Sequence, residues 1–265
     1  MNCKNCHTEL NTASGYCSRC GGKVIRNRLT LKNLIASFSA QFLDYDNKFL
    51  QTFINLFKKP EDVIGSYING TRKKYVNVVS YFSIALLVTG FEFFLLKRFF
   101  PEAIDLSAVT VAGQEAMAKE SFDLIQDNQS LVMMLFVPLY AIMSRLVFIN
   151  IKKFNYTEHL VIFMYIIAQV SIFAGILNII AAMSGISLGA LVYVTFPFQI
   201  LYSAYCLKRL YRLTLGGIVL RTLLFIVILV IFVITITILF YIGAFILLGK
   251  EGFMEFIQSM QPKQV

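Results

Sequence analysis

The sequence lacks the residues from which most catalytic sites are built. It has no tryptophan, two histidines, and fifteen acidic residues against twenty-four Lys and Arg. It contains no His-x-x-x-His pair, no Gly-x-Ser-x-Gly and no glycine-rich phosphate loop, so the usual metalloprotease, hydrolase and nucleotide-binding signatures are missing. The two histidines are His7 and His159, and only His159 has an adjacent acid, Glu158. We therefore expect no enzymatic activity.

Cysteine is scarce outside the first twenty residues. Four of the five cysteines are Cys3, Cys6, Cys17 and Cys20, and they form two Cys-x-x-Cys knuckles. The N-terminus has no apolar run typical of a secretory signal, so these thiols should stay reduced and act as metal ligands rather than form disulfides. Four thiolates complete a tetrahedral structural zinc site, which predicts a zinc ribbon over residues 1–22 with zinc as its cofactor. His7 could be a spare ligand, but a solvent-facing role is favoured.

Charged residues are few and apolar residues are abundant. The chain is 57% hydrophobic and 15% charged, with a mean hydropathy of +0.69. Typical soluble domains are about 45–50% apolar and about 25% charged. Runs of about 20 apolar residues are long enough to cross a bilayer. The pattern predicts a transmembrane domain over residues 76–248, followed by a tail over 249–265, with spans at about 76–96, 131–149, 160–183, 188–207 and 222–248.

The distribution of basic residues predicts the orientation of these spans. Residues 1–75 hold twelve Lys and Arg against five Asp and Glu, and Arg72, Lys73 and Lys74 stand directly before the first span. Positive segments beside membrane spans tend to stay in the cytoplasm. We expect a multi-pass protein of the bacterial inner membrane with its N-terminus in the cytosol and its C-terminus outside.

Residues 23–75 combine a basic linker with amphipathic segments at about 31–42, 46–57 and 60–68. Such helices could lie in the plane of the lipid headgroups, or they could pack on the cytosolic ends of the spans. Neither alternative is favoured. Anionic headgroups are the expected partner of the basic side chains, and nucleic acid is unlikely because no recognition fold is apparent. The side chains assigned to the membrane surface are Arg26, Arg28, Arg72, Lys73 and Lys74.

Several short motifs in the first 75 residues resemble a known family. The motifs are Tyr-Cys-Ser-Arg-Cys-Gly at 16–21, Phe-Leu-Asp-Tyr-Asp at 42–46, Thr52, Pro60, and Tyr-Ile-Asn-Gly-Thr-Arg-Lys-Lys-Tyr at 67–75. Together they are similar to an uncharacterised bacterial multi-pass membrane family with an N-terminal zinc ribbon, domain of unknown function 3667. The resemblance covers residues 1–85 and departs at Asn77-Val78, where such proteins often carry proline. It implies a topology and a zinc ribbon but no activity.

A few polar residues interrupt the spans and are candidates for a functional site. They are Glu92, Asn178, Thr195, Gln199 and Tyr202. Polar groups inside a membrane often mark a transport path. Alternatively, Glu92 could reach the surface or pair with the nearby Lys97 and Arg98, and the others could form hydrogen bonds between helices. Small and polar side chains at helical spacing on spans three and four suggest that these helices pack closely.

The sequence therefore predicts an all-α integral membrane protein with five transmembrane helices, preceded by short amphipathic helices and a small N-terminal zinc ribbon. The favoured function is a non-enzymatic interaction or scaffold protein whose zinc ribbon docks a protein partner. The alternative is a small transporter or channel that uses the polar faces of spans three and four with Glu92. An enzyme acting on lipid would need a polar cluster of Arg145, Glu158 and His159 at the inner surface. The sequence does not predict the oligomeric state.

Overall fold

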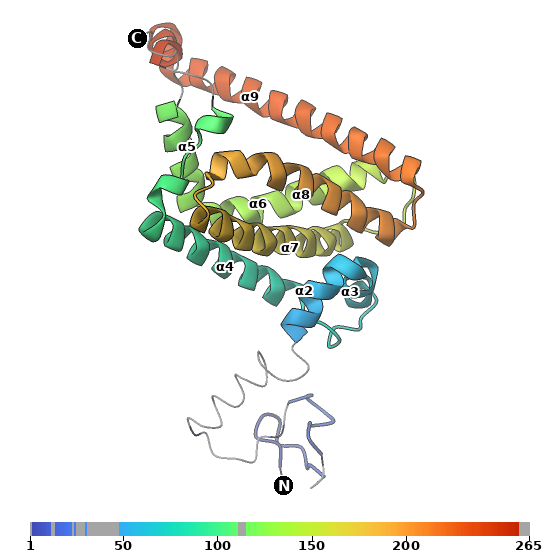
Figure 1. The fold of residues 1–265 in the computed structure, drawn as a ribbon. Helices are drawn as coiled ribbons and strands as arrows, with labels where there is room; N and C mark the ends of the chain where they lie inside the picture. The colour runs from blue at the N-terminus through green and yellow to red at the C-terminus, as the bar shows by residue number, and fades with distance from the viewer. Residues whose placement is uncertain are drawn as a thin grey trace. The chain divides into compact units, whose positions relative to one another are not determined.

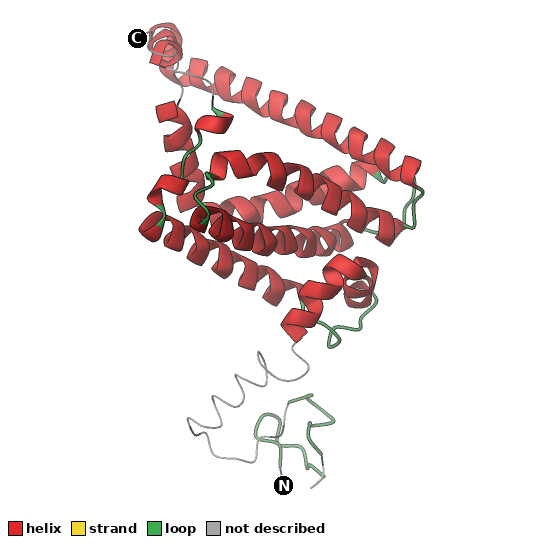
Figure 2. Ribbon diagram, in the orientation of Figure 1, coloured by secondary structure: helices red, strands yellow, loops and turns green. Residues whose placement is uncertain are grey.

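The computed structural model describes residues 2–11, 14–22, 24, 30, 48–110 and 115–259. The chain divides into two compact units, Met1–Asn47 and Lys48–Val265. The described part contains helices and loops but no strand (Figure 2). Its helices are α2 (Lys48–Lys58), α3 (Pro60–Ile68), α4 (Val78–Phe99), η1 (Pro101–Ala103), η2 (Ser107–Val109), α5 (Glu115–Asp127), α6 (Gln129–Val147), α7 (Tyr156–Met183), α8 (Leu188–Tyr211) and α9 (Leu215–Ser259).

Five helices of the second unit are long and apolar enough to cross a membrane: α4, α6, α7, α8 and α9 up to Met254. Helix α7 lies at the centre of the bundle and packs against α4, α6 and α8 (Figure 1). It carries the largest set of buried residues of any span, including the fully buried Gln169. The expected all-helical architecture is therefore present, with five helices that are long and apolar enough to span a membrane, while a ribbon at the N-terminus is indicated only by the cysteine cluster described below.

Side-chain caps explain where two of the spans begin. Asn77 caps α4 by accepting a hydrogen bond from the Ser80 N–H over 2.9 Å. At α7, Asn155 and Glu158 form a reciprocal capping box, which satisfies two N–H groups at the helix start. The sequence pattern suggests Thr157 as this cap and a start near residue 160. The cap is Asn155 instead of Thr157, and the helix starts at Tyr156, four residues before the predicted span.

Two spans contain an internal proline, Pro138 in α6 and Pro197 in α8. Proline has no N–H and removes one hydrogen bond from the helix ladder, so one carbonyl of each helix loses its usual partner. Helix α9 begins at Leu215, before the predicted range 222–248, and its helical path is broken directly after that range, at Gly249, which has φ 69°. Most of its apolar side chains are exposed, as expected for a helix that faces lipid.

Helices α2 and α3 pack on one end of the bundle instead of lying apart from it. Leu56, Val63 and Ile64 are completely buried in the same core as the spans. Phe53 and Phe57 pack against this core, and the Phe57 ring contacts Tyr202 at a centroid distance of 5.4 Å. For these two helices the packing alternative is therefore correct. The predicted segment 31–42 lies outside the described residues.

Tyrosines of α8 cap the end of α2. The last four carbonyls of a helix have no partner within it. The Tyr202 hydroxyl donates to the Leu56 carbonyl over 3.1 Å, and the Tyr205 hydroxyl donates to the Lys58 carbonyl over 3.2 Å. These bonds supply two of the missing partners and fix α2 against α8.

Two ion pairs hold α3 in place. The Arg209 Nε, in the last turn of α8, donates to the Glu61 carboxylate over 3.0 Å. The Lys74 ammonium lies 2.7 Å from the Asp62 carboxylate, which also accepts a hydrogen bond from the Tyr75 hydroxyl over 2.6 Å. Both acids stand in the first turn of α3, where the helix dipole favours negative charge.

Candidate functional site

The four N-terminal cysteines converge on one point. Their Sγ atoms all lie within 4.8 Å of one another, and none is in a disulfide. Two sulfur pairs join the knuckles: Cys3 to Cys20 and Cys6 to Cys17 are each 3.6 Å apart. The described residues of the first unit thus form a small module around a thiol cluster.

The two knuckles repeat the same backbone geometry. His7 N–H donates to the Cys3 carbonyl over 2.8 Å, and Gly21 N–H donates to the Cys17 carbonyl over 2.9 Å. Both donors have left-handed backbones, with φ 58° at His7 and 68° at Gly21. Histidine is among the few residues other than glycine that adopt this conformation with some frequency. His7 therefore has a backbone role in the turn, and its side chain is not part of the thiol cluster.

The cluster has the size that a tetrahedral metal ion requires. With Zn–S bonds of ~2.3 Å, adjacent sulfurs in a regular tetrahedron are about 3.8 Å apart. The two sulfur pairs between the knuckles, at 3.6 Å, are near this value, and no pair exceeds 4.8 Å. Hydrogen bonds from the side chain and backbone of Thr8 lower the pKa of the Cys6 thiol to about 6, which favours the thiolate that binds metals. The residues present therefore fit a bound metal ion.

A polar cavity of about 190 Å³ lies inside the helical bundle. Helices α4, α5, α6, α7 and α8 all contribute to its wall. Four of the five predicted intramembrane polar residues line it, namely Glu92, Asn178, Thr195 and Gln199, and they are joined there by the polar side chains of Thr89, Gln126, Gln129 and Ser171.

Among the described residues, Glu92 is the only acidic side chain that lines this cavity, and it is 6% exposed. One carboxylate oxygen accepts a hydrogen bond from the Asn178 amide over 2.7 Å. The other lies against Gly175, where an added Cβ would be 2.8 Å from it. Within the described residues Glu92 forms no ion pair, and Lys97 instead stacks on the Phe93 ring at 5.6 Å. The expectation that Glu92 reaches the surface or pairs with Lys97 and Arg98 is therefore wrong.

The fifth predicted residue, Tyr202, points elsewhere, because its hydroxyl caps α2. The small residues of α7 that were expected to face α8 also contact other helices. Gly175 lies against Glu92 of α4, and Ser171 contacts the Met133 sulfur of α6 at 4.0 Å.

Sequence reasoning missed Thr89, although it lies three residues before Glu92 and thus on the same helix face. Gln126 and Gln129 carried no such signal, since they belong to a polar connecting segment.

A second pocket, of about 510 Å³, lies where α6 ends and α7 begins. Arg145, Glu158 and His159 all line it, as a lipid-directed enzyme would require. However, both ring nitrogens of His159 are occupied: Nδ1 is 2.8 Å from the Asn155 carbonyl and Nε2 is 2.9 Å from the Tyr211 hydroxyl. Glu158 belongs to the capping box. These two residues therefore stabilise the start of α7 and the end of α8.

The basic residues assigned to the membrane surface differ in their surroundings. Lys74 pairs with Asp62, while Arg72 and Lys73 are exposed beside it. The Arg72 guanidinium lies 5.3 Å from the centre of the Tyr67 ring. Arg26 and Arg28 lie outside the described residues.

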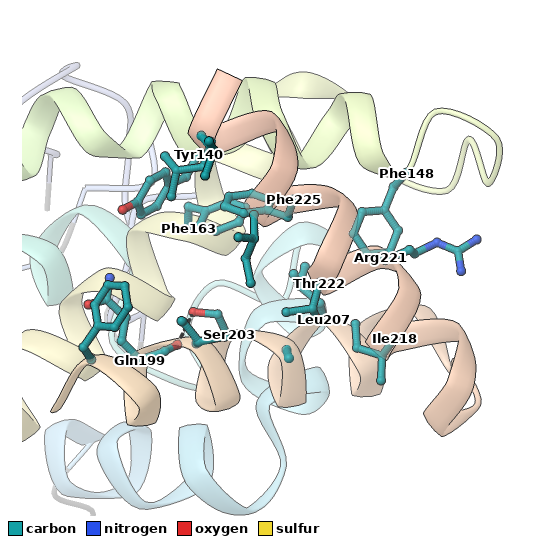
Figure 3. A pocket seen from close by; sticks show the side chains of 16 residues that line it. Tyr140, Phe148, Phe163, Gln199, Ser203, Leu207, Ile218, Arg221, Thr222 and Phe225 are labelled. Carbon is teal, nitrogen blue, oxygen red and sulfur yellow. Dashed lines mark hydrogen bonds between the residues drawn. The ribbon is translucent and has the colours of Figure 1, made fainter. Parts of the chain in front are cut away.

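An apolar groove of about 330 Å³ lies between α6, α8 and the first half of α9. Figure 3 shows the rings of Tyr140, Phe163 and Phe225 close together in this groove, with Arg221 near Phe148 at the other end. The Arg221 guanidinium lies 5.4 Å from the Phe148 ring centre. Gln199 of α8 lines both this groove and the polar cavity.

Comparisons with known proteins extend this description over part of the chain only. No curated protein and no solved structure matches it. Residues 46–90, which include α2, α3 and the first half of α4, match the family described as "Protein of unknown function (DUF3667)". Over that stretch the chain is similar to an uncharacterised family, and the match brings no activity with it and does not reach the thiol cluster.

Proposed function

We propose that this chain is a membrane-anchored docking protein without enzymatic activity. Its four cysteines would hold a structural zinc ion, and the zinc module would present a rigid surface to a protein partner in the bacterial cytosol. The observation that carries the proposal is the convergence of four thiols within 4.8 Å. Four thiolates fill the coordination sphere of zinc, which leaves no open position for a substrate and favours a structural role.

The rigidity of the helical bundle supports a docking role. Helices α2 and α3, which follow the linker, are held against the spans by buried aromatic side chains and by the Tyr202 and Tyr205 hydrogen bonds. On this proposal Arg72 and Lys73 face anionic headgroups on the cytosolic side. His159, which follows Glu158 in the sequence, has both ring nitrogens in hydrogen bonds, which supports a non-enzymatic function.

Metal analysis of the purified full-length protein tests the zinc site. We expect about one zinc ion per chain, as a closed four-thiolate site holds. Cys17→Ser should lose the metal, because it removes a buried ligand. Cys206→Ala is the matched control, since Cys206 is a buried cysteine of α8 outside the cluster, and it should retain the metal. Recovery of wild-type protein with a disulfide in place of zinc would contradict the proposal.

Affinity purification from native membranes tests docking. The same tagged wild-type, Cys17→Ser and Cys206→Ala proteins are isolated, and co-purifying proteins are quantified by mass spectrometry. We expect at least one protein to be retained by wild type and Cys206→Ala but lost from Cys17→Ser and after chelation. A set of proteins that is identical in all four samples would reject docking through the zinc module, even where zinc is bound.

A further inference from the structure

We propose that the polar cavity around Glu92 binds a monovalent cation of the size of Na⁺ in exchange for a proton on the Glu92 carboxyl. This binding site is independent of docking through the N-terminal module. The proposal rests on the charge of Glu92, on the oxygen atoms that line the cavity, and on the position of the cavity in the bundle.

The charge of Glu92 has no compensation in the described structure. The side chain is 6% exposed, and its hydrogen-bond partner, the Asn178 amide, carries no net charge. An ionised carboxylate in such a place is strongly unfavourable unless a positive charge accompanies it. In the part of the chain that the structure describes, no other titratable side chain lines the cavity. The carboxyl must therefore hold a proton or share the cavity with a cation.

The oxygen atoms around Glu92 suit a hard cation. The second carboxylate oxygen of Glu92 faces Gly175, and the Gln126 side-chain oxygen is buried without a hydrogen-bond partner. The Thr89 and Thr195 hydroxyls donate to carbonyls of their own helices, over 2.7 Å and 3.2 Å, which leaves their oxygen lone pairs able to bind a cation. Carboxylate, amide and hydroxyl oxygens are the donors that alkali and alkaline-earth ions prefer.

A single carboxylate selects for one positive charge. Divalent ions such as Ca²⁺ are usually held by several carboxylates, whereas the described lining of this cavity has one. A monovalent cation neutralises Glu92 completely. The volume of about 190 Å³ leaves room for the ion together with water molecules.

The cavity lies near one end of the bundle. Glu92 stands seven residues before the end of α4, or about 10 Å along the helix axis. Gln129 is the first residue of α6 and Gln126 belongs to α5, so the polar wall continues to the connecting segment. Charged side chains close to this wall in sequence are Lys97 and Arg98 on α4, and Asp123 and Asp127 on α5; α7 and α8 place none there. The polar lining of the cavity therefore extends from the spans into the segment that connects α4 to α6.

The exchange balances as follows: protonated Glu92 and a free cation give ionised Glu92 with the bound cation and one released proton. No oxidant or further reactant is needed. Because one proton leaves for each ion that binds, the apparent cation affinity should rise about tenfold per pH unit while the free site is protonated.

Proton release from the full-length protein in lipid nanodiscs tests the proposal. NaCl is added to weakly buffered samples, with choline chloride as the control for ionic strength, and binding of radioactive Na⁺ is measured in parallel. We expect Na⁺ to release protons and to bind with the pH dependence given above. Glu92→Gln should abolish both signals, whereas Glu102→Gln, which changes an exposed acid on η1, should leave both unchanged.

A second variant guards against misfolding of Glu92→Gln. Gly175→Ala keeps every cavity oxygen but places a methyl group against the Glu92 carboxylate, so it should weaken Na⁺ binding while the circular dichroism spectrum is retained. Na⁺ binding that persists in Glu92→Gln would refute the proposal. A proton that titrates at Glu92 without any response to Na⁺ would also refute it, because the carboxyl would then hold a proton only.

Discussion

The hydrogen bond from Tyr202 to the Leu56 carbonyl should contribute measurably to stability. Leu56 is completely buried and Tyr202 is 5% exposed, so water cannot replace the lost donor in Tyr202→Phe. A buried carbonyl left without a partner costs about 1–3 kcal/mol. Tyr205→Phe is the matched control, because its bond to the Lys58 carbonyl is exposed to solvent. Water can replace that donor, and the expected cost is about 0.5 kcal/mol or less.

Thermal unfolding of the full-length variants in detergent, followed by far-ultraviolet circular dichroism, measures this difference. For a chain of this size about 1 kcal/mol corresponds to about 2–4 °C in Tm, so Tyr202→Phe should lower Tm by about 2–12 °C. Tyr205→Phe should lower it by about 2 °C or less on the same scale. Equal shifts in the two variants, or a larger shift for Tyr205→Phe, would refute the reasoning from burial.

Two further predictions concern α3 and α8. The hydrogen bond from the Lys74 ammonium lowers the pKa of Asp62 below its value in the unfolded chain, which is ~3.9. The stability from this pair is therefore fully present above pH ~3.9 and disappears as the pH falls through the pKa of Asp62 in the folded protein. Asp62→Asn should therefore be less stable than wild type at pH 7, by less than about 1 kcal/mol because the pair is exposed, and the difference in Tm should shrink below about pH 4. Gly189→Ala should destabilise the protein by about 1–3 kcal/mol, since its Cβ would lie 2.7 Å from the Asp105 carbonyl oxygen, while Gly90→Ala, which meets nothing within 4 Å, should not lower Tm.

The spans could be predicted from the sequence because hydropathy and length decide them. Their boundaries depend on local contacts that a hydropathy pattern does not contain. Helix α7 starts four residues earlier than predicted because Asn155 and Glu158 cap it reciprocally. Helix α9 begins at Leu215, before the predicted start at about 222, whereas its regular helical path ends at Leu248 as predicted, because Gly249 has a non-helical backbone.

The position of α2 and α3 could not be predicted, because an amphipathic face packs equally well against lipid and against protein. Phe53 and Phe57 would have been buried in either case. What distinguishes the two is the set of polar partners from distant helices, such as Tyr202, which lies 146 residues from Leu56 in sequence. A sequence alone does not show which tyrosine meets which carbonyl.

The members of the polar cavity could be recognised one by one, but their grouping could not. Glu92, Asn178 and Gln199 are conspicuous because they interrupt apolar spans. Tyr202 is equally conspicuous and lies three residues after Gln199, yet it faces α2 instead of the cavity. The rotation of each helix about its axis decides this, and that rotation follows from the packing of all its neighbours.

The contact between Glu92 and Gly175 makes two distant positions depend on each other. The carboxylate occupies the space that any side chain at 175 would need. An acid at 92 therefore favours glycine at 175, because alanine or a larger residue there would displace the carboxylate from its present position. In natural variation the two positions should change together, and the loss of the acid would remove the constraint on the glycine.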